Sequence, residues 1–153
     1  MGKSVKVGDP APNFKLLSET GQTIELKNFI GVSPVVLFFY PRDNTIICTK
    51  EVCRFRDSFD EFKMVNNAEV IGISSDSVDS HKQFSEVNKL PFTLLSDPDE
   101  EIRGLYGVPK TLGIVPGRVT YVIDIDGIIR HIFSSQLNYK AHIKEALSVL
   151  KSM

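Results

Sequence analysis

The sequence predicts an α/β fold, with a mixed central sheet flanked by helices and an N-terminal β-hairpin. A continuous apolar run at 35–40 is typical of a strand that is buried on both faces, and 69–74 is predicted to be a second buried strand. A predicted helix follows each of these strands, as in a βαβ unit. Turn residues at 18–21 and 126–127 indicate two hairpins, one in each half of the chain.

The first half of the chain is expected to hold three strands and one long helix. Strands at 13–17 and 22–26 flank the first turn, and the apolar run 35–40 follows. A helix is predicted from 49 to about 65, because apolar side chains recur there at spacings of three and four. These side chains form one stripe, consisting of Val52, Phe55, Phe59, Phe62 and Val65.

The run 69–74 is the next strand, and it leads to a helix over 79–88. Asp79 or Ser80 is the expected N-cap of that helix. A short helix is predicted to start at Asp97, because a proline and three acidic residues follow it. Proline is favoured in the first turn of a helix, and acids are favoured near its positive end.

The second hairpin and a closing helix complete the predicted order. Gly104 or Gly107 ends the short helix, and strands 119–124 and 128–133 follow. Asn138 is expected to cap a final helix through Leu150. This order matches a thioredoxin-like α/β layout, and no repeat or linker divides the 153 residues, so we expect one domain.

Composition narrows the function classes. Hydrophobic residues make up 42% of the chain and charged residues 24%, as in an ordinary globular protein. The formal net charge is -1 and no basic tract is present, which argues against nucleic acid and membrane partners. The N-terminus has no hydrophobic signal core, so a cytoplasmic, reducing location is expected, although a processed form of a targeted protein would look the same.

Cys48 and Cys53 are the only cysteines in the sequence, and they lie where a strand passes into a helix. A helix start offers free backbone N–H groups and partial positive charge, both of which favour a thiolate over a thiol. We therefore predict that Cys48 is a partly ionised nucleophile near neutral pH. Helical projection places Cys48 on the core side with Val52, and Cys53 on the solvent side with Arg56.

The spacing of the two cysteines has a mechanical consequence. In a regular helix their Cα atoms lie about 8.6 Å apart, whereas a disulfide needs less than about 7 Å. The pair can therefore close only after the helix unwinds, which predicts two conformations. Inert core cysteines are the alternative interpretation. A metal site is not expected, because the three histidines show no ligand spacing: His81, His131 and His142.

The segment from Phe39 to Asp57 resembles the peroxiredoxins, and in particular the branch of the bacterioferritin comigratory protein, or peroxiredoxin Q. The pattern Pro-x-x-x-Thr-x-x-Cys of that family is met by Pro41, Thr45 and Cys48. A second cysteine five residues later, followed by Phe-Arg-Asp after one arginine, resembles this branch specifically.

The resemblance implies a thioredoxin-dependent thiol peroxidase without metal or organic cofactor. It implies that Cys48 attacks a hydroperoxide and becomes a sulfenic acid, and that Cys53 resolves it as an intramolecular disulfide. Thr45 would hydrogen-bond the thiolate and the peroxide, Arg118 would complete the anion-stabilising site, and Pro41 would shield it. Thioredoxin is the implied reductant, with glutaredoxin as the alternative, and a monomer or weak dimer is implied.

The similarity extends over nearly the whole chain, including 8–14 and 117–124, with one departure. The branch commonly carries Pro-Gly where this chain has Ile46 and Ile47. Two β-branched residues make the loop stiffer and more apolar. This departure leaves the loop geometry and the substrate preference open, while the reaction class is retained.

Several alternatives stay open on the residues alone. Thr45 could simply cap the following turn, and nothing in the pattern distinguishes Arg118 from Arg42 or Arg54. A disulfide reductase would use Cys-x-x-Cys, which the spacing here does not match. A non-enzymatic redox sensor would use the same cysteine pair, so turnover has to separate sensor from enzyme.

Overall fold

A seven-stranded mixed sheet forms the centre of the computed structural model, which describes residues 4–111 and 115–153. The strand order is β2-β1-β5-β4-β3-β8-β9; β3, β4 and β5 are parallel, and the other neighbours are antiparallel. The strands of the sheet are β1 Lys15–Ser18, β2 Thr23–Glu25, β3 Val35–Phe39, β4 Glu69–Ser74, β5 Thr93–Ser96, β8 Val119–Ile123 and β9 Ile129–Ser134. Two short strands, β6 Lys110–Thr111 and β7 Val115–Pro116, pair separately.

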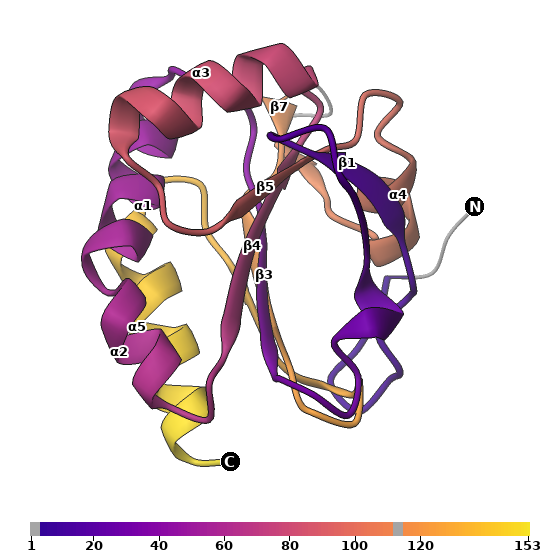
Figure 1. Cartoon of the computed structure of the whole chain (residues 1–153). Helices are drawn as coiled ribbons and strands as arrows, with labels where there is room; N and C mark the ends of the chain where they lie inside the picture. The colour runs from indigo at the N-terminus through magenta and orange to yellow at the C-terminus, as the bar shows by residue number, and fades with distance from the viewer. Residues whose placement is uncertain (1–3, 112–114) are drawn as a thin grey trace.

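Helices cover the two faces of the sheet unequally. They are α1 Ile46–Asp57, α2 Phe59–Met64, α3 Val78–Asn88, α4 Glu101–Tyr106 and α5 Tyr139–Lys151, with a 3-10 turn at Leu26–Asn28. Figure 1 shows α1, α2 and α5 on one side, α3 at the end of that layer, and α4 with the β1 segment on the other side. Among the described residues, none of the helices has the length and apolar character needed to cross a membrane.

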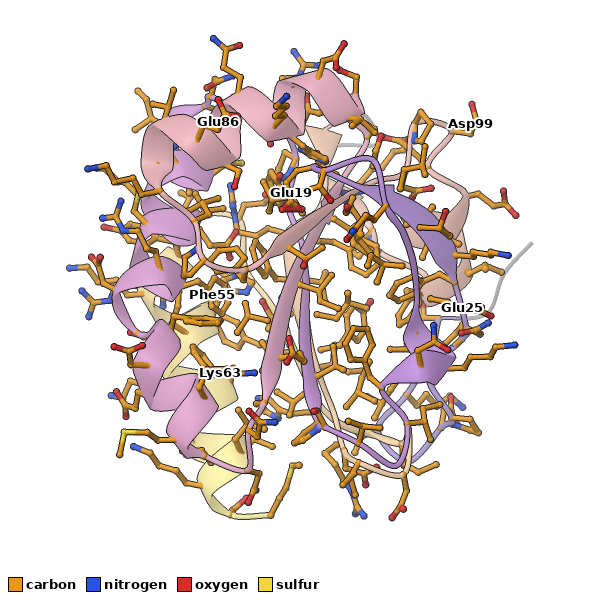
Figure 2. The ribbon with its side chains drawn as sticks, viewed as in Figure 1. Glu19, Glu25, Phe55, Lys63, Glu86 and Asp99 are labelled. Atoms are coloured by element: carbon orange, nitrogen blue, oxygen red, sulfur yellow. The ribbon has the colours of Figure 1, made fainter. Side chains whose placement is uncertain are left out.

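Strand β3 sits at the centre and builds a core on both faces. All five of its residues are buried, and they alternate between two apolar clusters. Phe38 faces the helical layer, where it stacks on Phe55 with ring centroids 4.4 Å apart; Figure 2 shows Phe55 pointing from α1 toward the sheet. Each such ring contributes about 1.5–3 kcal/mol by burial, so this contact fixes α1 against the strand that precedes it.

The predicted fold class is confirmed, but strand β5 of the central sheet was missed, as were the short strands β6 and β7. Strand β5 has only four residues, a run too short for periodicity alone to mark it as a strand. It becomes a strand because it pairs with β4 on one side and with β1 on the other. The sheet thereby joins the N-terminal hairpin to the parallel strands through long-range contacts.

The helix predicted over 49–65 starts earlier, at Ile46, and is divided at Ser58. The N–H of Ser58 donates to the carbonyls of Arg54 and Phe55, and α2 starts after it. The apolar stripe continues across this break, which is why periodicity alone predicted one helix.

The predicted starts of the next two helices were also wrong. Helix α3 begins at Val78, and the hydroxyl of Ser77 accepts the N–H of Ser80, so Ser77 is the cap. Helix α4 begins at Glu101, after Glu100 takes a left-handed conformation with φ 57°. Asp97 still caps α4 from a distance, because its carboxylate accepts two backbone N–H groups from the first turn.

The remaining signals are confirmed. Gly107 ends α4 in the left-handed region, with φ 71°, where glycine is favoured. The turn at 126–127 connects β8 to β9, and Gly127 has φ 84°. The side chain of Asn138 accepts the N–H of Ala141 at the start of α5.

Candidate active site

The loop 41–45 connects β3 to α1 at the carboxyl edge of the parallel strands, where sites of this fold class lie. Thr45 is the N-cap of α1, with extended backbone angles. Cys48 is therefore in the first turn of the helix, where backbone N–H groups have no partner within the helix. This is the local environment that the sequence predicted for the nucleophile.

Cys48 faces the core, as predicted, with 1% of its surface exposed. The buried stripe of α1 holds it there, since Val52 and Phe55 pack in the same cluster. Nη2 of Arg118 donates a hydrogen bond to the Cys48 sulfur over 3.2 Å. A cation thus lies against the sulfur, although the two residues are 70 positions apart in the sequence.

Arg118 is held on all sides of its guanidinium. Nη1 donates to Oε1 of Glu51 over 2.6 Å, and Nε donates to the carbonyl of Gln136 over 3.0 Å. Arg118 is only 3% exposed, whereas Arg42 and Arg54 are exposed. The structure therefore selects the one arginine that the residues alone did not distinguish.

Glu51 and His142 extend this cluster, and the sequence analysis did not identify either. Burial raises the pKa of Glu51 to about 7, and the charge of Arg118 limits the rise. Burial by itself lowers the pKa of Arg118. The interactions of Arg118 with Glu51 and then with Cys48 have the larger opposite effect, so its pKa is raised. Burial lowers the pKa of His142 to about 4, so its ring is neutral at neutral pH.

The second oxygen of Glu51 lacks a clear partner. Oε2 is buried without a hydrogen bond among the described residues, and it lies 3.7 Å from Nδ1 of His142. That nitrogen pairs with the hydroxyl of Thr120 over 2.7 Å, while Nε2 of the ring donates to the carbonyl of Ser135. Glu51 could have been found from its spacing, one turn after Cys48 on the same side of α1; His142 had no local signal.

A pocket of about 430 Å³ opens above the sulfur. Two of its side chains are strongly exposed, Ile46 at 75% and Leu137 at 76%. The lining residues are Pro41, Thr45, Ile46, Ile47, Cys48, Arg118, Gln136 and Leu137. The departure at 46–47 thus lies at the mouth of the site and makes that mouth apolar.

Cys53 lies in the same uninterrupted helix as Cys48, and both are free thiols. Its side chain is half-buried at the edge of the helical core, so the predicted solvent-facing position is only partly correct. The sulfur points toward the end of α3, where Oδ1 of Asn88 lies 3.5 Å away. A Cys48–Cys53 disulfide requires α1 to unwind, because five residues of regular helix separate the two positions.

Comparison with known proteins identifies the family. The model of the AhpC/TSA family matches residues 7–132. The chain belongs to this peroxiredoxin family. Chloroplastic peroxiredoxin Q of Oryza sativa subsp. japonica is 48% identical over 150 residues, which cover 97% of this chain and 68% of that protein. The Arabidopsis thaliana protein of the same name is 48% identical over 149 residues, with the same coverage.

Solved structures agree with the fold and the branch. Peroxidoxin BcpB from Mycobacterium tuberculosis superposes with a TM-score of 0.88 at 38% identity, covering 97% of both chains. The bacterioferritin comigratory protein of Xanthomonas campestris gives a TM-score of 0.83 at 28% identity, covering 91% of this chain and 90% of that one. This peroxiredoxin is of the peroxiredoxin Q type, a thioredoxin-dependent thiol peroxidase whose two cysteines are consistent with an intramolecular disulfide.

Thr45 is placed differently from the expected contact. Its hydroxyl donates to the carbonyl of Arg42 over 2.9 Å, and no hydrogen bond to Cys48 is present. Nor does the side chain cap α1, although Thr45 is the N-cap residue. The hydroxyl of Thr45 stabilises the loop in this structure, and to donate a hydrogen bond to peroxide it would have to turn its proton away from the Arg42 carbonyl. Pro41 lies half-buried at the pocket, where shielding of the site is expected of it.

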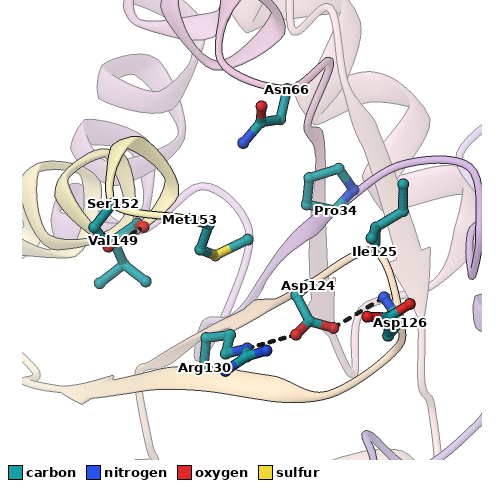
Figure 3. A pocket seen from close by; sticks show the side chains of 9 residues that line it. All are labelled: Pro34, Asn66, Asp124, Ile125, Asp126, Arg130, Val149, Ser152 and Met153. Carbon is teal, nitrogen blue, oxygen red and sulfur yellow. Dashed lines mark hydrogen bonds and ion pairs between the residues drawn. The ribbon is translucent and has the colours of Figure 1, made fainter.

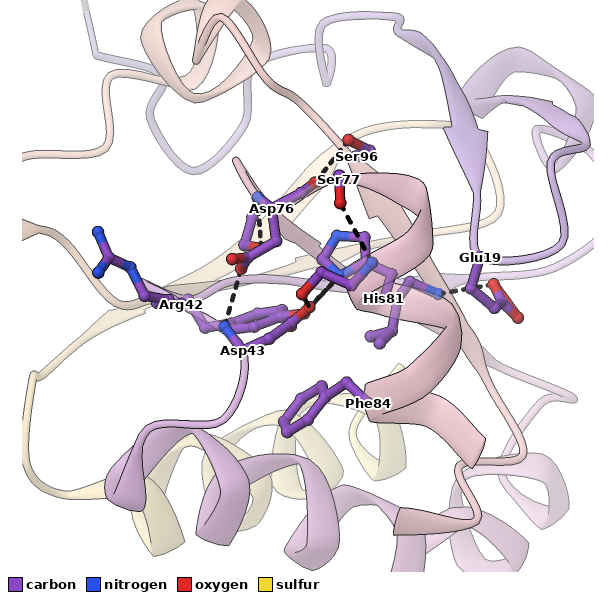
Figure 4. Close-up of polar contacts among 12 residues, drawn as sticks. Glu19, Arg42, Asp43, Asp76, Ser77, His81, Phe84 and Ser96 are labelled. Atoms are coloured by element: carbon purple, nitrogen blue, oxygen red, sulfur yellow. Dashed lines mark hydrogen bonds and ion pairs between the residues drawn. The ribbon is translucent and has the colours of Figure 1, made fainter. Parts of the chain in front are cut away.

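A buried clamp holds the middle of the active-site loop (Figure 4). Oδ2 of Asp43 lies 2.7 Å from Nδ1 of His81, and Oδ1 accepts the hydroxyl of Tyr40 over 2.6 Å. The N–H of Asp43 donates to Asp76 over 2.8 Å. Nε2 of His81 donates to the carbonyl of Leu95, so a proton must lie between Nδ1 and the carboxylate. The clamp ties the active-site loop to α3 and β5.

The same clamp contains possible metal ligands, namely Asp43, Asp76 and His81, whose ligand atoms lie within 4.8 Å of one another. These atoms are already used in hydrogen bonds. Oδ2 of Asp76 accepts from Ser74 as well as from the loop, and both ring nitrogens of His81 have partners. The arrangement is therefore that of a satisfied polar network, and the donor atoms do not point to an ion.

A larger pocket, of about 610 Å³, lies where β3 begins, at the opposite end of that strand from Cys48 (Figure 3). It is bounded by Pro34 before β3, by the turn after β8 and by the end of α5. Asp124 and Arg130 form an ion pair beside it. It contains neither cysteine, so volume alone does not locate the chemistry of this protein.

Proposed function

We propose that this chain reduces hydroperoxides with Cys48 as the nucleophile and Cys53 as the resolving cysteine. The observation that carries the assignment is the buried Cys48 sulfur, 3.2 Å from Nη2 of Arg118 at the start of α1. A thiol in that position gains a fixed cation and the helix start together. Cys53 is the remaining thiol of the sequence and lies on the same helix.

The first step transfers oxygen to sulfur. The Cys48 thiolate attacks one peroxide oxygen, the S–O bond forms and the O–O bond breaks. The product is a sulfenic acid, and the departing alkoxide or hydroxide takes a proton from solvent. Negative charge moves from sulfur to the departing oxygen, so a donor fixed beforehand stabilises the transition state. The planar fork of Arg118 suits this role, because Glu51 and Gln136 fix its orientation.

The later steps use Cys53 and an external dithiol. Cys53 condenses with the sulfenic acid, a disulfide forms and water leaves. Thioredoxin then reduces the disulfide through a mixed disulfide. We propose thioredoxin as the reductant in the cell, with glutaredoxin as the alternative to be compared. We also propose a monomer or weak dimer in the cytoplasm, where a reducing environment keeps both cysteines as thiols.

The pocket supports organic hydroperoxides as substrates beside hydrogen peroxide. Ile46 and Leu137 present aliphatic side chains at the mouth, where they would otherwise be exposed to water. An alkyl group that covers them gains about 25 cal/mol per Å² of apolar surface. The Xanthomonas campestris relative is known for reduction of alkyl peroxide, which supports the same substrate class here.

A coupled assay tests the proposal. The protein is mixed with peroxide, thioredoxin, thioredoxin reductase and NADPH, and NADPH consumption is followed. Sustained consumption is expected, whereas a redox sensor would consume one equivalent and stop. Cys48→Ser should abolish consumption, and retained turnover would refute the assigned nucleophile. Cys53→Ser should keep one fast oxidation by peroxide and lose cycling with thioredoxin.

A further inference from the structure

The end of α3 holds the turn of α1 that carries Cys53. The Cys53 sulfur donates to Oδ1 of Asn88 over 3.5 Å, a weak hydrogen bond. Nη1 of Arg56, almost one turn further along α1, donates to the backbone carbonyl of Asn88 over 2.8 Å. One residue therefore contacts the resolving cysteine and its neighbouring cation at the same time.

The side chain of Asn88 is itself oriented. Nδ2 donates to the carbonyl of Phe84 over 2.9 Å. Because a carbonyl only accepts, the amide nitrogen must point to Phe84 and the amide oxygen must face the sulfur. Lys89 ends α3 in the left-handed region, which leaves the Asn88 carbonyl without a helical partner and free for Arg56. The contact thus follows from how α3 ends.

Charge adds to the contact. The pKa of Arg56 is raised chiefly by its hydrogen bond to Asp57, against burial, and the Cys53 sulfur contributes in the same direction. Arg56 and Cys53 both contact Asn88, the first through its backbone carbonyl and the second through its side-chain oxygen. These three groups hold the second turn of α1 against α3 while Cys48 is reduced.

We propose that Asn88 is a positioning residue for the resolving step. It holds Cys53 of α1 against the end of α3 and so limits how fast Cys53 reaches the sulfenic acid of Cys48. The inference rests on the proposed function. In that step the Cys53 thiolate attacks the sulfur of the sulfenic acid, the S–S bond forms and the S–O bond breaks. The departing hydroxide takes up the proton that Cys53 released, and water leaves.

The contact breaks before the sulfurs meet, because Cys53 has to move toward the first turn of α1. The other anchor, between Asp43 and His81, lies before α1 and is separate from it. A slow release lengthens the life of the sulfenic acid. A second peroxide then oxidises Cys48 to sulfinic acid in competition with disulfide formation. Asn88 therefore influences the sensitivity of the enzyme to excess peroxide.

Asn88→Ala tests the inference, with Gln83→Ala on the exposed side of α3 as the matched control. The chain has no tryptophan, so rapid acid quench, alkylation of free thiols and mass spectrometry should follow both steps. Disulfide formation is expected to be about three- to tenfold faster in Asn88→Ala than in the wild type, as for loss of a weak hydrogen bond. Oxidation of Cys48 should stay within about twofold, because no contact of Arg118 involves Asn88.

A second measurement and a second variant complete the test. The peroxide concentration that converts half of Cys48 to sulfinic acid should rise by the same factor as the resolving rate. Asn88→Asp keeps an acceptor oxygen beside Cys53, and its carboxylate accepts a stronger hydrogen bond from the Cys53 thiol than the amide does, so Cys53 should be released more slowly and disulfide formation should be slower than in the wild type. A merely structural role would loosen the helix and shift both variants in the same direction.

The outcomes are distinct. A resolving rate in Asn88→Ala at or below that of the wild type and of Gln83→Ala would overturn the inference, as would equal acceleration by Asn88→Asp. Failure of the proposed function would appear earlier, as a wild-type Cys48 that does not form sulfenic acid or a Cys53 that never pairs with it.

Discussion

Glu51 makes the stability of this protein depend on pH in an unusual direction. Its carboxyl is fully buried, and its pKa is about 7 in the folded protein against an ordinary value of 4.5. Between these values the folded state binds more protons at this site than the unfolded state. The free energy of unfolding therefore falls as pH rises from about 4.5 to 7. The difference of about 2.5 pH units corresponds to about 3 kcal/mol at about 1.36 kcal/mol per unit.

Glu51→Gln should remove this dependence, because the amide has nearly the same shape and does not titrate. Urea unfolding of both proteins at several values between pH 4.5 and 8 gives the difference in free energy of unfolding. We expect that difference to move by about 2–3 kcal/mol in favour of Glu51→Gln as pH rises. Glu86→Gln, at an exposed position on α3, is the control and should show no such trend.

The comparison of wild type and variant also separates Glu51 from His142. The pKa of His142 is lowered to about 4, so the unfolded state binds more protons there and stability falls as pH drops below about 6.5. This contribution has the opposite sign to that of Glu51, so the direction of the trend with pH tells the two groups apart. Parallel stability profiles for wild type and Glu51→Gln would refute a neutral-pH titration of Glu51 and the account of the cluster built on it.

Three further results are expected. Arg118→Lys should slow oxidation of Cys48 about 10²–10³-fold in single-turnover assays, because a lysine lacks the planar fork that reaches the sulfur and Glu51 together; a normal rate would contradict that role. Ile46→Ser should lower kcat/KM for a long-chain alkyl hydroperoxide severalfold and leave that for hydrogen peroxide unchanged, with Leu105→Ser on α4 as the control for loss of an exposed apolar residue. Gly72→Ala should cost about 1–3 kcal/mol in urea unfolding, since its Cβ would lie 2.6 Å from the Phe38 ring; an unchanged midpoint would count against the tight packing of β4.

The local part of the site could be predicted from the sequence. The apolar run before Pro41 indicated a buried strand, and the stripe of α1 indicated a helix directly after it. These patterns depend on neighbouring residues only, so they placed Cys48 at a helix start and on the core side. The same spacing showed that Cys53 cannot reach it without unwinding. The selection of Arg118 came from family resemblance, since a single arginine carries no local pattern.

Tertiary structure decided everything that joins distant segments. β5 exists because β4 and β1 pair with it, and Glu51 acquires a pKa of about 7 only inside the packed cluster. Asn88 meets Cys53 because α3 ends beside α1. The periodicity of a helix or strand depends on residues that are close in the sequence. Burial and charge at a site depend on contacts between residues that are far apart in the chain. For that reason the sequence by itself determined where the thiol stands, and the fold determined its chemical surroundings.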